Sequence, residues 1–121
     1  IGLMIAHRRA IAQGDRALRE GRWVLEAKTM TRSLGENVLG IVGLGSIGAA
    51  VARRAEAMRM TVRWWGPSPK PDAPWPRADS LVALAEQSDV LVIAARADAA
   101  NRGLISAQVI HALGSQGLLV N

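Results

Sequence analysis

The stretch from Val38 to Gly48, VLGIVGLGSIG, constrains the fold of this chain more than any other. It begins with a short apolar run rich in branched residues, which is typical of a buried parallel strand. Three glycines follow in the spacing G-x-G-x-x-G, and apolar residues then recur at helical spacing, so a helix begins where the glycines end. A strand, a glycine turn and a helix in this order indicate a nucleotide-binding turn.

Each glycine of the motif has a separate expected role. Gly43 permits the tight turn, Gly45 lets a pyrophosphate approach the backbone, and Gly48 lets the helix pack closely on its strand. The free N–H groups near Ser46 and Ile47 then face the anion, aided by the helix dipole. The alternative is a glycine-rich turn without a ligand, and the strand and helix around the motif favour the nucleotide.

The rest of the chain predicts an alternation of strands and helices. Strands are expected at 38–42, 61–65, 90–94 and 118–120. All five prolines fall between Pro67 and Pro76, which predicts a surface loop there. Asp79 or Ser80 can cap a helix that runs to about Gln87, and Ser106 can cap another. The residues expected to face inward on these two helices are Leu81, Leu84, Ala85, Val109, Ile110 and Leu113.

This alternation predicts an α/β fold. Right-handed crossovers give a Rossmann-type, doubly wound parallel sheet of about four strands with flanking helices, most simply in the order 3-2-1-4. We expect one dinucleotide-binding domain over residues 1–121, with an opening helix at 1–20, an arm at 21–37 and the Rossmann core at 38–121.

The opening helix carries an apolar stripe. Met4, Ile11 and Leu18 lie seven residues apart, and Gly21 can end the helix. The stripe either packs on the sheet of its own chain or forms a subunit contact. Trp23 in the arm has the same two interpretations, as a local plug or as part of a contact. The chain begins inside the helical pattern without a methionine, which predicts further residues upstream.

Composition excludes several classes of function. The absence of cysteine excludes a disulfide scaffold, a thiolate metal site and a cysteine nucleophile. His7 and His111 show no metal-ligand spacing, so no metal site is expected. The net charge of +5 is dispersed, which favours solvated helix faces over a nucleic-acid surface. No apolar run is long enough for a membrane span and no signal-peptide pattern opens the chain, so we expect a cytoplasmic location.

The end of the second strand bears on the choice of dinucleotide. In this fold an acidic residue about 20 positions beyond the glycines usually bonds the adenosine ribose hydroxyls. Gly66 stands there instead, so the carboxylate that would disfavour a 2′-phosphate is absent. Ser68 and Lys70 could contact such a phosphate, although Lys70 could equally be a solvated loop lysine. The cofactor is therefore expected to be NAD or NADP, with the balance favouring NADP.

Taken together, these segments resemble the nucleotide-binding domain of the D-isomer-specific 2-hydroxyacid dehydrogenases, which include glycerate, formate and phosphoglycerate dehydrogenases and hydroxypyruvate reductases. The matching segments are LGENVLGIVGLGSIGAAVARRAEAMRMTVRWW, SLVALAEQSDVLVIAA and NRGLISAQVIHALGSQGLLVN. The resemblance implies an NAD(P)-dependent oxidoreductase that transfers hydride between nicotinamide and a small 2-hydroxy or 2-keto acid. It also implies a homodimer built on this domain.

The resemblance implies cofactor contacts in the glycine turn, at Gly66 and in the loop after the third strand. In that loop the family has a Pro-Leu-Thr run with a second threonine, whereas this chain has Arg96-Ala97-Asp98 and then Asn101. Asn101 could replace a threonine hydroxyl, or these could be solvated loop residues. The complete set of expected cofactor-binding residues is Gly43, Gly45, Ser46, Ile47, Gly48, Gly66, Ser68, Lys70, Ala95, Arg96 and Asn101.

No catalytic residue is expected in this chain. The resemblance places the family's substrate-binding arginine shortly after Asn121, and its acid–base histidine further on, with the substrate domain also absent. We therefore expect these residues alone to bind a cofactor without turnover. Two alternatives remain: a non-catalytic nucleotide-sensing or dimerisation module of the same fold, and another nucleotide-fold enzyme, such as a relative of adenosylhomocysteine hydrolase, whose match outside the glycine turn is poorer.

Overall fold

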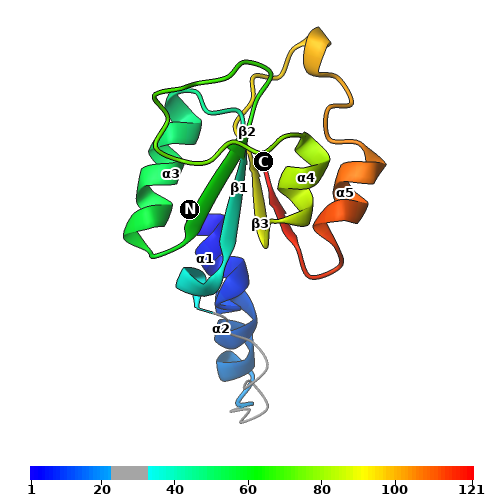
Figure 1. The fold of residues 1–121 in the computed structure, drawn as a ribbon. Coiled ribbons are helices and arrows are strands. Elements are labelled where there is room, and N and C mark those ends of the chain that lie inside the picture. The colour runs from blue at the N-terminus through cyan, green and yellow to red at the C-terminus, as the bar shows by residue number, and fades with distance from the viewer. Residues whose placement is uncertain (23–32) are drawn as a thin grey trace.

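The computed structural model describes residues 1–22 and 33–121 and shows a parallel sheet between two helical layers (Figure 1). The described part contains four strands, in the order β2-β1-β3-β4. They are β1 (Val38–Val42), β2 (Thr61–Trp65), β3 (Val90–Ile93) and β4 (Leu118–Val120). The doubly wound α/β fold expected from the sequence is confirmed, and the strands lie within one residue of their predicted bounds.

The predicted strand order of 3-2-1-4 is wrong. β1 pairs with β2 on one side and with β3 on the other, so the strand after the proline-rich segment lies beside β1 and not outside β2. The place outside β2 is taken by a single bridge between Trp64 and Arg77. There the Trp64 N–H donates to Pro76 O at 3.1 Å and the Ala78 N–H donates to Trp64 O at 2.8 Å. Because the prolines before Arg77 lack N–H groups, this segment cannot form a full strand.

Helices cover both faces of the sheet. On one face lie α3 (Ser46–Ala57) and the buried Met4 of α1 (Gly2–Arg8), and on the other lie α4 (Leu81–Glu86) and α5 (Ala107–Leu113). The Ser80 hydroxyl accepts from the Ala83 N–H at 3.0 Å, so Ser80 is the cap of α4. Ser106 caps α5 in the same way. The predicted core positions of α4 are all buried.

One predicted core residue of α5 is exposed. Ile110 is 50% exposed, whereas Val109 is buried and Leu113 packs partly against the same cluster. Residues 109 and 113 are four apart and share a helix face, while residue 110 is turned by about 100° from residue 109. The short α5 therefore presents only a narrow apolar face to the sheet.

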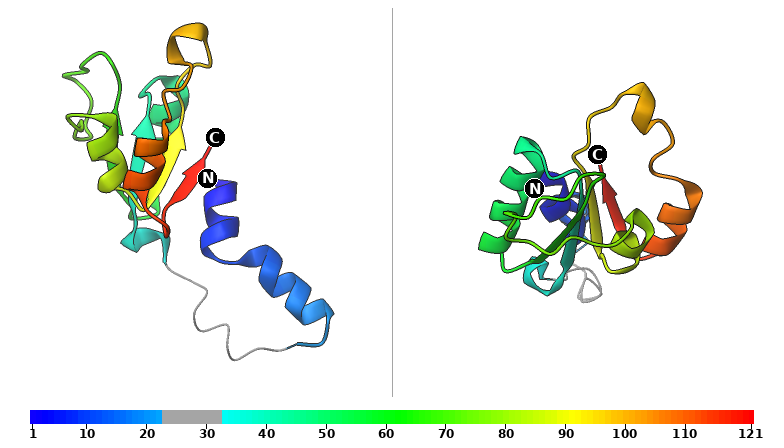
Figure 2. Two further views of the ribbon diagram at one scale, coloured as in Figure 1. Left: turned by 90° about the vertical axis from the view of Figure 1, so that its right-hand side faces the viewer. Right: turned by 45° about the horizontal axis from the view of Figure 1, so that its top comes forward.

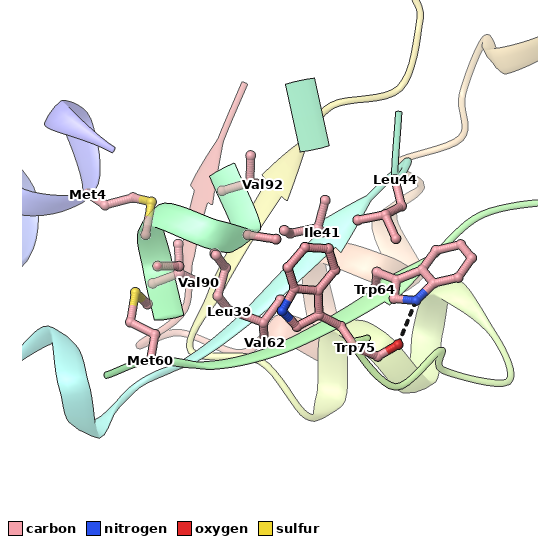
Figure 3. Close-up of a cluster of buried hydrophobic side chains, with 12 residues drawn as sticks. Met4, Leu39, Ile41, Leu44, Met60, Val62, Trp64, Trp75, Val90 and Val92 are labelled. Carbon is pink, nitrogen blue, oxygen red and sulfur yellow. Dashed lines mark hydrogen bonds between the residues drawn. The ribbon is translucent and has the colours of Figure 1, made fainter. Parts of the chain in front are cut away.

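The core on the α3 face is built around two tryptophans (Figure 3). Trp64 of β2 is 1% exposed, and its indole N–H donates to the carbonyl of Trp75 at 2.9 Å. Trp75 lies in the proline-rich segment and is itself buried. This contact fastens the segment to the edge of the sheet, in place of a longer ladder of strand hydrogen bonds.

The predicted opening helix at 1–20 is in fact two helices. α1 ends at Arg8 and α2 (Ile11–Arg19) begins after Ala10, which has a left-handed backbone with φ of 48°. The predicted apolar stripe divides at this break: Met4 is fully buried, whereas Ile11 and Leu18 are 52% and 56% exposed. Figure 2 shows α2 directed away from the sheet. The 3-10 helix η2 (Leu34–Glu36) precedes β1, and Trp23 lies outside the described residues.

Candidate functional site

Three strand ends meet at the glycine turn. The Gly43 N–H donates to Trp65 O at the end of β2, at 2.8 Å, and the Ala94 N–H donates to Val42 O at the end of β1, also at 2.8 Å. The turn is thus held from both neighbouring strands. Ligands of open parallel sheets bind outside these carboxyl ends, so the turn lies where a dinucleotide is expected.

The backbone geometry explains each glycine of the motif. Gly43 has φ of +92°, and a Cβ there would lie 2.9 Å from the Ala95 backbone. A Cβ at Gly48 would lie 2.2 Å from the Gly43 carbonyl oxygen, so α3 can pack on the turn only without that atom. A Cβ at Gly45 would meet nothing within 4 Å. Neither packing nor backbone strain therefore explains Gly45, and its bare surface faces open space.

The start of α3 presents unbonded amides to the same space. The first hydrogen bond into the helix runs from the Ala49 N–H to Gly45 O at 2.9 Å, and no side chain caps this end. The N–H groups of Ser46, Ile47 and Gly48 precede the helical ladder, as at any helix start. Ser46 and Ile47 are exposed. This amide cluster, at the positive end of the helix dipole, suits a phosphate group.

Gly66 follows β2 and is buried. A Cβ there would lie 3.3 Å from the Trp64 ring, so the tryptophan occupies the room beside it. The Gly66 carbonyl accepts from Arg77 Nη2 at 2.7 Å and from Arg77 Nε at 3.3 Å. A guanidinium therefore lies against the backbone of the residue at which the sequence motif would have a carboxylate. Sequence reasoning missed Arg77, because only the bridge to Trp64 brings it to this strand end.

The other two expected residues of this region lie in the proline-rich loop. Ser68 is exposed in the proline-rich loop. Lys70 lines an open groove of about 770 Å³ between α3 and this loop, with Arg53 of α3 among the other lining residues. Lys70 is therefore placed toward α3.

The loop after β3 brings Ala95, Arg96 and Asn101 together. Ala95 lies against Gly43, beside the turn. The Asn101 side-chain amide donates to Arg96 O at 2.7 Å, and the Asn101 N–H donates to the Asp98 carboxylate at 3.0 Å. Asn101 thus shapes its own loop. Its amide oxygen, an acceptor, has no hydrogen bond within the described residues.

The two histidines lie elsewhere. His7 belongs to α1 and His111 to α5, and both are exposed. Within residues 1–22 and 33–121, no three potential ligands cluster as a metal site would require. The same described residues include no helix with the length and hydrophobicity of a membrane span.

Comparison with known proteins agrees with this geometry. The model of the D-isomer specific 2-hydroxyacid dehydrogenase family, NAD binding domain, matches residues 1–121. The chain belongs to this family. It is an NAD(P)-binding domain, and the other nucleotide-fold enzyme considered above is therefore set aside.

Individual relatives support the assignment. The chain is 36% identical over its full length to a glyoxylate/hydroxypyruvate reductase A of Arabidopsis thaliana and 38% identical to the hydroxyphenylpyruvate reductase of Plectranthus scutellarioides. It also resembles the crystal structure of an NADPH-dependent glyoxylate/hydroxypyruvate reductase from Sinorhizobium meliloti in complex with NADP and malonate. The TM-score is 0.83 and the identity 31%, over 98% of this chain and 38% of that one. The chain spans about 39% of the length of the two curated relatives.

Proposed function

We propose that this chain binds a nicotinamide dinucleotide across the carboxyl ends of its strands. We further propose that it is the cofactor domain of an oxidoreductase that transfers hydride between the nicotinamide and a small 2-hydroxy or 2-keto acid. The observation that carries the proposal is the open space at Gly45, next to the unbonded amides that begin α3. A diphosphate fits both features, because it needs close approach to the backbone and several N–H donors.

The proposed contacts lie at the ends of three strands, and each strand end holds a different part of the dinucleotide. The turn holds the diphosphate, Gly66 and the proline-rich loop hold the adenosine ribose, and the loop after β3 forms the opposite wall. The complete set is Gly43, Gly45, Ser46, Ile47, Gly48, Gly66, Ser68, Lys70, Ala95, Arg96 and Asn101. The bound nicotinamide would supply the hydride, while these residues bind and orient the dinucleotide.

We propose that these 121 residues bind the cofactor without turnover. Acid–base chemistry requires a side chain within hydrogen-bond reach of the substrate, and the two histidines are exposed residues of α1 and α5, away from the glycine turn. Calorimetric titration with NAD and NADP should show binding, and glyoxylate and hydroxypyruvate should leave the absorbance of the reduced cofactor unchanged. Reduction of either acid by this chain would contradict the second expectation. Failure to bind either dinucleotide would overturn the proposed function.

For the cofactor we propose a preference for NADP. Its support is the glycine in place of the ribose-binding carboxylate, and Lys70 in the adjoining loop. The relative from Sinorhizobium meliloti is described as NADPH-dependent. A tighter dissociation constant for NAD than for NADP would refute this preference.

We also propose a homodimer in which α2 contributes to the contact, and a cytoplasmic location.

A second candidate function is a non-catalytic nucleotide-sensing or dimerisation module of the same fold. The unusual loop from Arg96 to Asn101 favours it, because the hydrogen bonds of Asn101 are made within the loop itself. Dehydrogenase activity of the protein that contains both this domain and a substrate domain would favour the enzyme over the non-catalytic module.

A further inference from the structure

We propose that Arg77 selects a dinucleotide that carries a 2′-phosphate, by binding that phosphate with its guanidinium. This inference rests on the proposed function, because it concerns the adenosine end of the same cofactor. It adds a residue that no sequence motif indicates.

The guanidinium of Arg77 is fixed in place at several points. Nη2 and Nε both donate to Gly66 O, at 2.7 and 3.3 Å, and the guanidinium carbon lies 5.8 Å from the centroid of the Trp64 ring. The backbone of Arg77 forms the bridge to Trp64, and the Trp64 ring is buried. A guanidinium held by a bidentate contact and an aromatic face loses little further freedom when it binds an anion.

The positive charge of Arg77 is not neutralised by a carboxylate. Within residues 1–22 and 33–121, ion pairs join Arg19 to Asp15 and Arg22 to Glu20, and none includes Arg77. Gly66 O is a neutral acceptor and engages two of the five N–H groups, so Nη1 and one hydrogen of Nη2 can still donate. Arg77 is exposed, so an anion can reach it.

The position of this charge matches the ribose end of the cofactor. Trp65 O accepts from the Gly43 N–H at 2.8 Å, so Gly66, the anchor of Arg77, is the chain neighbour of a residue that bonds the glycine turn. In this fold the residue at the end of the second strand faces the adenosine ribose, and an arginine nearby can accept a 2′-phosphate. Gly66 carries no carboxylate that would pair with Arg77, so the guanidinium is available for the phosphate.

The test compares Arg77→Met with Arg53→Met by titrating each purified protein with NADP and with NAD. Arg53 of α3 lines the groove that Lys70 also lines, so its variant removes the same charge from a residue that does not contact Gly66. We expect Arg77→Met to weaken NADP binding at least tenfold, about 1.4 kcal/mol, and to change NAD binding less than about twofold. Arg53→Met should keep the ratio of the two affinities, and raised salt should reduce the NADP preference of the unmodified protein.

Arg77→Lys keeps the charge and loses the contact of two nitrogens with Gly66 O. It is the variant to titrate if Arg77→Met does not fold. It should bind NADP with a smaller preference over NAD than the unmodified protein does. An unchanged ratio in Arg77→Met, or in Arg77→Lys if the former is unfolded, overturns the inference, as does equal weakening of both cofactors. If the unmodified protein prefers NAD, the inference about Arg77 fails while nucleotide binding stands. If it binds neither, the proposed function itself fails.

Discussion

At the scale of residues, the three glycines of one turn are required for different physical reasons. Gly43 needs its positive φ, and Gly48 needs the absence of a Cβ because a carbonyl oxygen would lie 2.2 Å away. Neither constraint applies to Gly45. Its backbone is extended, with φ of −86° and ψ of −162°, and a Cβ there would meet nothing within 4 Å. Its conformation is open to any residue, which supports the proposal that the glycine serves the approach of a ligand.

This difference predicts that one alanine substitution weakens dinucleotide binding and that another lowers the stability of the fold. Gly45→Ala should leave the free energy of unfolding unchanged and weaken dinucleotide binding about tenfold, because the methyl group occupies the approach of the diphosphate. Gly48→Ala should lower the free energy of unfolding by about 1–3 kcal/mol, because α3 must shift. Urea denaturation and calorimetric titration measure the two quantities. Full binding by Gly45→Ala would show that the diphosphate does not approach this glycine.

At the scale of elements, α1 is anchored to the domain although Met4 is its one buried residue. Met4 is fully buried in the core of the α3 face. The Arg8 guanidinium donates to the carbonyls of Asp89 and Gln116, which precede β3 and β4. The helix is therefore held by one apolar side chain and one cation that reaches two backbone acceptors.

Met4→Ala should destabilise the protein by about 2–5 kcal/mol, because it removes a fully buried side chain from the core. Leu3→Ala is the matched control: Leu3 is 66% exposed, so its truncation should change stability by less than about 0.5 kcal/mol. Both are measured by urea denaturation. Equal effects of the two variants would mean that α1 is not anchored through Met4.

At the scale of the whole molecule, α2 presents apolar side chains away from the core. Ile11 and Leu18 lie two helical turns apart on the same side, and each is more than half exposed. Of the two interpretations of the opening stripe, packing on the chain's own sheet holds for Met4 and not for these two residues. The remaining apolar surface supports the proposed homodimer.

Light scattering after size exclusion should therefore give a mass near twice the 12.9 kDa of one chain. Combining Ile11→Asp with Leu18→Asp should yield a monomer, because two charges would be buried in the contact. Ile110→Asp serves as the control: Ile110 is 50% exposed and belongs to α5 on the other face of the sheet, so the dimer should persist. A monomeric unmodified protein would contradict the proposal for this chain.

The local features could be predicted because each depends on residues close together in sequence. Strands β1 and β2, the start of α3 at the glycines and the Ser80 cap follow from apolar periodicity, missing side chains and a hydroxyl before a helix. The break at Ala10 gave no such signal, since an alanine with positive φ is tolerated only where surrounding contacts hold it. Ile110 was misplaced because a seven-residue helix has too few turns to define its buried face.

The sequence by itself determined that this chain forms a parallel α/β sheet with a nucleotide-binding turn, because a buried strand, three glycines and an amphipathic helix succeed one another directly. Only the tertiary structure decided that β3 lies beside β1 and not outside β2, and that Arg77 meets Gly66. Both depend on pairings between segments that are distant in the chain. The free energy of such pairings comes from packing around Trp64 and Trp75 and from backbone hydrogen bonds across the sheet edge, which no local pattern records.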